Sequence, residues 1–107
     1  MERVAFLLGI KPGNEAEYKR RHDEIWPEMV EALTAAGARN YSIYFDTNGR
    51  RQFAYLEAEP DFKTFVGLIT VDPVNARWQD YMKDIMDVTV DDAINWPVRL
   101  EEAFHME

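Results

Sequence analysis

The chain has 107 residues, enough for one domain with a single core and too few for separate cofactor and substrate domains. Its formal charge of -8 repels phosphate backbones and anionic lipid heads, so nucleic acid and membrane surfaces are poor candidate partners. It has no cysteine, which excludes disulfides, thiolate metal sites and cysteine nucleophiles and fits a cytoplasmic protein.

The N-terminal segment predicts a strand followed by a helix. Residues 3–10 are nearly all apolar and include β-branched side chains, which is typical of a strand covered on both faces, and the run is too short to span a bilayer. Residues 11–13 predict a turn. Asn14, followed three residues later by Glu17, resembles a capping box, so we expect a helix to begin at Asn14.

This helix is predicted to carry one apolar stripe and one break. Pro27 has no N–H to donate and its ring would collide with the carbonyl of Asp23, so the helix should break between Asp23 and Trp26 and restart at Pro27. The break places His22 near a helix end, where its ring can face a cavity. Gly37 is expected to end the second helical piece in a left-handed conformation. The stripe consists of Tyr18, His22, Ile25, Trp26, Met29, Val30 and Leu33.

The middle of the chain predicts a β-hairpin. Residues 39–45 and 52–58 read as two strands, and residues 46–49 read as the turn between them. Tyr41 and Tyr44 fall on opposite faces of the first of these strands, so one faces the helices and the other faces the free side of the sheet. For either tyrosine, simple packing is the alternative to a functional role.

The last third predicts two helices and a final strand. Residues 60–69 read as a short helix, and Asp72 before Pro73 is a strong cap signal for the next one. Residues 89–95 are acidic and loop-like, and residues 98–106 alternate apolar and polar side chains as a last strand does. The apolar face of the second helix is expected to carry Val74, Trp78, Tyr81, Met82 and Ile85.

The order strand, helix, strand, strand, helix, strand predicts an α+β fold over residues 1–107 as a single domain. This is the ferredoxin-like βαββαβ pattern, an antiparallel sheet with its helices on one side. The predicted strands carry apolar or aromatic groups on both faces, which leaves one apolar face uncovered. A homodimer whose two sheets face each other across a barrel-like interior would cover it.

Two histidines offer the groups that titrate near neutral pH. His22 lies four residues from both Tyr18 and Trp26, so the three side chains occupy successive turns of roughly one helix face. It is the first candidate for acid/base chemistry, and a core histidine bonded to the backbone is the alternative. His105, beside Glu101 on the predicted last strand, is a secondary candidate, because most such histidines are surface or interface residues.

The other candidate side chains give weaker indications of function. Trp78 is either a core residue or a stacking surface for a pyranose ring, and spacing does not choose between these roles. Glu24, Glu28 and Glu31 form a row that is typical of a solvated helix face. The chain lacks HExxH, an EF-hand loop, a P-loop and a GxGxxG turn, so metal and nucleotide sites are not indicated. Ser42 lies mid-strand without neighbouring glycines, which argues against serine hydrolase chemistry.

Four segments of the sequence resemble the L-rhamnose mutarotase family: EAEYKRRHDEIWPEM, GARNYSIYFD, RWQDYMKDIM and LEEAFHM. The resemblance implies a dimeric α+β barrel of ferredoxin-like subunits that interconverts the α and β anomers of L-rhamnose without cofactor or metal. It implies that His22 is the proton donor and that Tyr18, Tyr41 and Trp78 bind the sugar. The family usually has a second tryptophan after the first, where this chain has Gln79. An amide hydrogen-bonds hydroxyls instead of stacking, so Gln79 is expected to bind substrate and leaves the exact sugar open.

Mutarotation requires few catalytic groups. The pyranose opens when its ring oxygen is protonated and the anomeric hydroxyl loses its proton, and it then closes on the other face of the aldehyde. One acid/base group near neutral pH, with a positioned water or second side chain, suffices. Two other functions fit the same pattern. Small dimeric ferredoxin-like monooxygenases and haem-degrading proteins also carry inward-facing Trp, His and Asn, and a sensor domain would bind a sugar without converting it.

Overall fold

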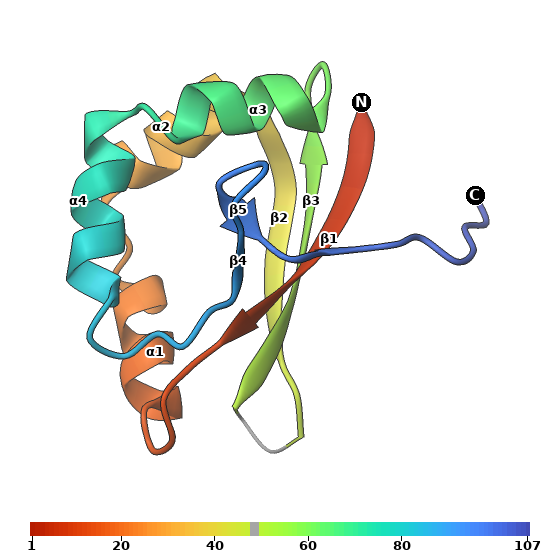
Figure 1. The fold of residues 1–107 in the computed structure, drawn as a ribbon. Coiled ribbons are helices and arrows are strands. Elements are labelled where there is room, and N and C mark those ends of the chain that lie inside the picture. Colours follow the sequence, from red (N-terminus) through yellow and green to blue (C-terminus); the bar gives the residue numbers. More distant parts are fainter. Residues whose placement is uncertain (48–49) are drawn as a thin grey trace.

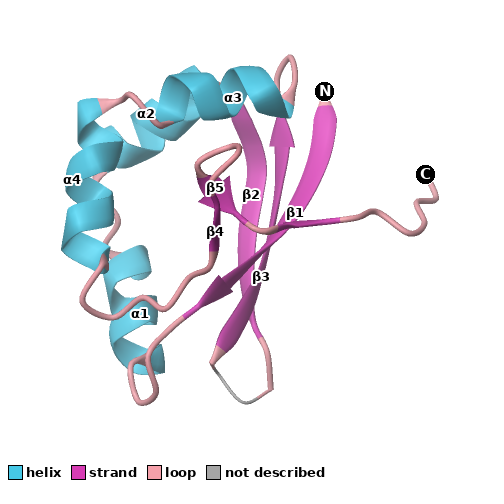
Figure 2. Cartoon of the chain, in the orientation of Figure 1, coloured by secondary structure: helices cyan, strands magenta, loops and turns pink. Residues whose placement is uncertain are grey.

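The structure of the chain is a computed structural model that describes residues 1–47 and 50–107. Its main sheet is antiparallel, in the order β2-β3-β1-β6, and helices cover one of its faces (Figures 1 and 2). The strands of this sheet are β1 (Glu2–Gly9), β2 (Ala38–Phe45), β3 (Arg51–Ala58) and β6 (Arg99–Leu100). The helices are α1 (Glu15–Asp23), α2 (Pro27–Ala36), α3 (Phe62–Ile69) and α4 (Pro73–Met82). The predicted α+β class and antiparallel sheet are confirmed.

The helix boundaries follow the local signals closely. Pro27 is the first residue of α2, and Gly37 ends this helix with a left-handed φ of 110°, so the predicted break and stop are both confirmed. The carboxylate of Asp72 accepts a hydrogen bond from the Val74 amide and caps α4 as expected. The predicted capping box is wrong, because the Asn14 amide donates to carbonyls of the preceding turn and makes no cap bond to α1.

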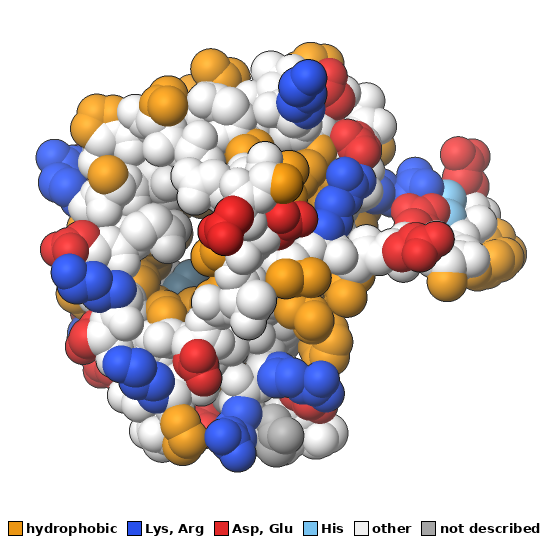
Figure 3. Space-filling model, in the orientation of Figure 1, with side chains coloured by type: hydrophobic (Ala, Val, Ile, Leu, Met, Phe, Trp, Pro, Cys, Tyr) orange, Lys and Arg blue, Asp and Glu red, His pale blue; other side chains and the backbone are white. Residues whose placement is uncertain are grey.

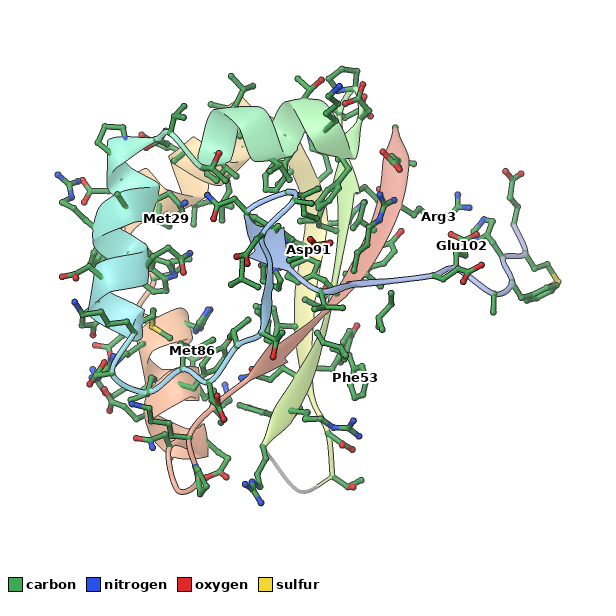
Figure 4. The ribbon with its side chains drawn as sticks, viewed as in Figure 1. Arg3, Met29, Phe53, Met86, Asp91 and Glu102 are labelled. Carbon is green, nitrogen blue, oxygen red and sulfur yellow. The ribbon has the colours of Figure 1, made fainter. Side chains whose placement is uncertain are left out.

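The two faces of the sheet have different roles. On β3, Gln52, Ala54, Leu56 and Ala58 are buried toward the helices, where most of the core lies. On the opposite face, Phe53 pairs with Leu7 of β1 and Tyr44 of β2, and Figure 4 shows Phe53 on the side away from the helices. Tyr41 lies on the helix face against Phe6, so the prediction that Tyr41 and Tyr44 face opposite ways is confirmed. The predicted turn residues Asn48 and Gly49 lie outside the described residues.

The predicted last strand is much shorter than expected. β6 pairs with β1 only at Ala5 and Phe6, and residues 101–107 have no regular structure and extend away from the body of the protein (Figure 1). A strand needs backbone pairing as well as alternation, and after Leu100 the chain diverges from β1, although β1 itself begins at Glu2 and could have been paired further. An ion pair of 3.0 Å between Arg3 and Glu102, both labelled in Figure 4, holds the segment that follows β6.

The segment before β6 is more ordered than its acidic composition indicates. It contains β4 (Val90–Asp91) and β5 (Trp96–Pro97), which pair with each other in a separate two-stranded sheet. Trp96 is buried with its ring edge-on to the rings of Phe6, Phe62 and Phe65, so this segment is anchored in the core. Across the described parts of the chain, none of the helices has the length and apolar content needed to cross a membrane.

Candidate active site

A cavity of about 730 Å³ lies between α1, α2, α4 and the helix-facing side of β2. Figure 3 shows this face of the molecule hollowed between the helices and the β4–β5 segment. The volume lies within the range of about 300 to 1,000 Å³ that is typical of small-molecule sites. Its lining combines aromatic rings with a few polar groups and includes Tyr18, His22, Tyr41, Asn75, Trp78, Gln79 and Trp96.

His22 is the titratable imidazole of this cavity. Its Nδ1 lies 3.1 Å from the backbone oxygen of Tyr18, one turn earlier in α1. A carbonyl oxygen can only accept, so Nδ1 carries the proton of this hydrogen bond and Nε2 remains for a ligand. Burial lowers the pKa of His22, and the hydrogen bond to Tyr18 offsets this only in part. The imidazole is therefore mainly neutral at neutral pH, with Nε2 as a base.

Aromatic rings fix the orientation of this imidazole. The Tyr18 ring stacks on it at 4.1 Å between centroids, and Trp78 meets it edge-on at 5.4 Å. Burial raises the pKa of Tyr18, and the nearby Tyr41 phenol raises it further. Burial also raises the pKa of Tyr41. Both phenols therefore stay protonated at neutral pH, so they can donate hydrogen bonds to a ligand and do not act as bases.

Trp78 is the centre of a second aromatic group. It is buried in α4 with its ring edge-on to Trp26 at 5.1 Å, and Trp26 stacks on Tyr81 at 5.6 Å. These contacts join the start of α2 to α4, and they hold the indole of Trp78 as a rigid wall of the cavity beside His22.

Arg21 ties α1 to the end of α4. Its guanidinium donates to the Glu17 carboxylate at 2.6 Å, to the Asp84 carboxylate at 2.8 Å and to the Tyr81 carbonyl at 2.8 Å. It also lies over the Tyr81 ring, 4.6 Å from the centroid. Because His22 is the next residue, these contacts of Arg21 hold the part of α1 that carries the imidazole against α4.

A sequence model of the family described as L-rhamnose mutarotase matches residues 3–106. The chain belongs to the L-rhamnose mutarotase family. The L-rhamnose mutarotase of Listeria monocytogenes is 44% identical over 108 residues, which cover 99% of both proteins. The family is one of isomerases, so the chain is an enzyme of that class.

Solved structures agree with this membership. The crystal structure of an L-rhamnose mutarotase from Formosa agariphila superposes with a TM-score of 0.80 and 35% identity, over 100% of both chains. Tetracenomycin F2 cyclase from Streptomyces glaucescens superposes with a TM-score of 0.62 and 15% identity, over 100% of this chain and 98% of the cyclase. The second likeness concerns the fold alone.

In this member of the mutarotase family, the predicted site residues come together. Tyr18, His22, Tyr41, Trp78 and Gln79 come from α1, β2 and α4, and all of them line the same cavity. His105 does not join them, since it lies in the exposed segment after β6. The glutamate row of α1 and α2 is exposed, as expected of a solvated face.

Sequence reasoning missed Asn75, which lines the cavity, and Arg21, which joins α1 to α4 beside it. Asn75 lines the cavity from a buried position, and its signal was an amide four residues before Gln79 on one helix face. Arg21 had no signal beyond its place beside His22. Among the described residues, no group of three or more His, Asp or Glu side chains lies together as metal ligands would.

Proposed function

We propose that this enzyme interconverts the α and β anomers of L-rhamnose, or of a related aldose, with His22 as its acid/base group and without a cofactor. The observation that carries this proposal is the imidazole of His22, which lines a cavity of about 730 Å³ with its Nδ1 tied to the backbone and its Nε2 left for a ligand. A six-membered sugar ring fits a space of this volume. The choice of L-rhamnose as the sugar follows from the names of the relatives, which are L-rhamnose mutarotases.

The reaction needs one proton to move between two oxygens of the same carbon. Nε2 of neutral His22 takes the proton of the anomeric hydroxyl, the anomeric carbon becomes an aldehyde, and its bond to the ring oxygen breaks. The imidazolium then gives the proton to the ring oxygen, which becomes a hydroxyl. Rotation of the aldehyde and the reverse steps close the ring as the other anomer. One nitrogen serves both oxygens because both are attached to the anomeric carbon.

The remaining lining residues hold the sugar. Tyr18 and Tyr41 donate hydrogen bonds to its hydroxyls, because their raised pKa values keep both phenols protonated. The rigid indole of Trp78 contacts the apolar C–H face of the ring. Gln79 offers its amide to a hydroxyl at the edge of the cavity. General acid/base assistance of about 10² to 10⁴-fold is sufficient for a reaction that already proceeds slowly in water.

We also propose that the enzyme is a cytoplasmic homodimer whose ferredoxin-like subunits form a barrel through the free faces of their sheets. The support is the row of Leu7, Phe53 and Tyr44 on that face, with Tyr44 64% and Phe53 38% exposed. The segment after β6 adds two highly exposed apolar side chains, Phe104 and Met106. Apolar surface of this extent is typical of an interface with another protein chain.

Substitution of His22 tests the proposed chemistry. We expect His22→Asn to lower enzymatic anomer exchange of L-rhamnose by about 10²-fold or more, measured by saturation-transfer NMR. His105→Asn, which removes the other histidine from an exposed segment, is the matched control and should keep the parent rate. Exchange near the parent rate in His22→Asn would rule out the proposed role. Sugar binding without exchange in the parent protein would instead indicate a binding module.

A further inference from the structure

A short chain of amide hydrogen bonds runs along the α4 wall of the cavity. The Nδ2 of Asn75 donates to the Ile69 carbonyl at 3.1 Å, and the Nε2 of Gln79 donates to the Oδ1 of Asn75 at 3.1 Å. Asn75 is only 7% exposed, so its side chain is held inside the protein. Both amides line the same cavity as His22, on either side of Trp78 in the sequence.

The direction of this chain is fixed by its first member. The Ile69 carbonyl can only accept, so the end of Asn75 that faces it must be the NH₂ group. The Oδ1 of Asn75 is then the acceptor for its neighbour, and Gln79 must present its own NH₂ group to it. The Oε1 of Gln79 is consequently left as an acceptor for a ligand. The backbone thus decides which end of the Gln79 amide is free.

We propose that Asn75 is a positioning residue that holds Gln79 with its carbonyl oxygen ready to accept a hydrogen bond from one ring hydroxyl of the sugar. This inference rests on the proposed function and names the feature of the substrate that this edge of the site recognises. A hydroxyl acceptor next to the Trp78 indole matches a pyranose, which presents C–H groups on one face and hydroxyls at its edge. A glutamine already held in place loses less rotamer freedom on binding than a mobile one.

A double-mutant cycle tests whether Asn75 acts through Gln79. Initial rates are measured by polarimetry on freshly dissolved single-anomer L-rhamnose, for the parent, Asn75→Ala, Gln79→Leu and the double variant. We expect Gln79→Leu to raise KM by about fivefold to tenfold, with a much smaller change in kcat. Asn75→Ala should raise KM by about twofold to fivefold in the parent background and leave KM unchanged when Gln79 is already leucine.

The hydroxyl is identified with L-rhamnose analogues that each lack one ring hydroxyl. Loss of the recognised hydroxyl should raise KM in the parent and have no such effect in Gln79→Leu. The Ile69 carbonyl keeps its bond from the Asp72 amide when Asn75 is changed, and Asn75→Ser is used in the cycle if Asn75→Ala has a lowered unfolding midpoint. The thermal midpoint of each variant is measured alongside.

Two outcomes would overturn the positioning role while leaving the enzyme a mutarotase. One is an equal rise in KM for the Asn75 variant with and without Gln79, and the other is an equal penalty for every missing hydroxyl in the parent and in Gln79→Leu. A parent protein that does not accelerate anomer exchange would overturn the proposed function and this inference together.

Discussion

Gln52 is a buried polar side chain that should destabilise the fold. It is 0% exposed on the helix face of β3, where its cross-strand neighbours are Leu8 and Phe45, and neither its Oε1 nor its Nε2 has a hydrogen-bond partner among the described residues. A buried amide without a partner costs about 1 to 3 kcal/mol. Gln52→Leu removes both polar atoms at similar side-chain volume, so it should stabilise the protein by about the same amount.

An increase of about 1 to 3 kcal/mol in the free energy of unfolding raises the thermal unfolding midpoint of a domain of this size by about 4 to 12 °C. Differential scanning calorimetry of the parent and Gln52→Leu measures this shift. The chain's other glutamine supplies the control, because Gln79→Leu removes a hydrogen bond to Asn75 at an exposed position and should give no rise. A midpoint for Gln52→Leu at or below that of the parent would show that the Gln52 amide is satisfied in solution, and the reasoning would be refuted.

Three further predictions concern the pH dependence of the enzyme, the contacts of Arg21 and the proposed dimer interface. Burial lowers the pKa of His22, so the rate of anomer exchange, measured by NMR, should be constant above about pH 6.5 and fall in acid. The stability measured by calorimetry should also fall as the pH drops through about 6.5, because the unfolded chain takes up the proton first. Both of these losses should be absent in His22→Asn. Arg21→Met should lower the exchange rate by about tenfold by displacing the imidazole, whereas Arg20→Met, which loses exposed ion pairs to Glu17 and Glu24, should not. Phe53→Glu should give a monomer in sedimentation velocity, and Leu68→Glu, an exposed leucine on α3, should keep the parent's state.

Local signals predicted most of the fold, and the failures have a common cause. The break at Pro27, the stop at Gly37 and the cap at Asp72 depend on neighbouring backbone groups, so the sequence contains the information needed. The last strand depends on a distant partner. Its alternation was real, but the chain pairs with β1 only at Arg99 and Leu100 before it diverges, and no local pattern records where two strands separate.

The residues of the candidate site also fall into those that the local sequence predicted and those that depend on tertiary contacts. Helical spacing and the break before Pro27 indicated a cavity at His22, whereas the role of Trp78 followed only from the family resemblance; both side chains line the same cavity. Arg21 was not, since the Asp84 carboxylate it binds is 63 residues away and only the folded chain brings the two together. The role of Asn75 depends on the Ile69 carbonyl, whose direction is set by the end of α3. Contacts that need tertiary placement therefore remained outside the reach of the sequence.

The anchoring of Trp96 has a consequence for when the enzyme becomes competent. This indole both packs against Phe6 of β1 and lines the cavity, although it comes from β5, far from β1 in the sequence. During translation, β1, the helices and the hairpin leave the ribosome well before it. Until Trp96 has left the ribosome, the cavity lacks the wall that this indole supplies, so a nascent chain or a product truncated before Trp96 has an incomplete pocket.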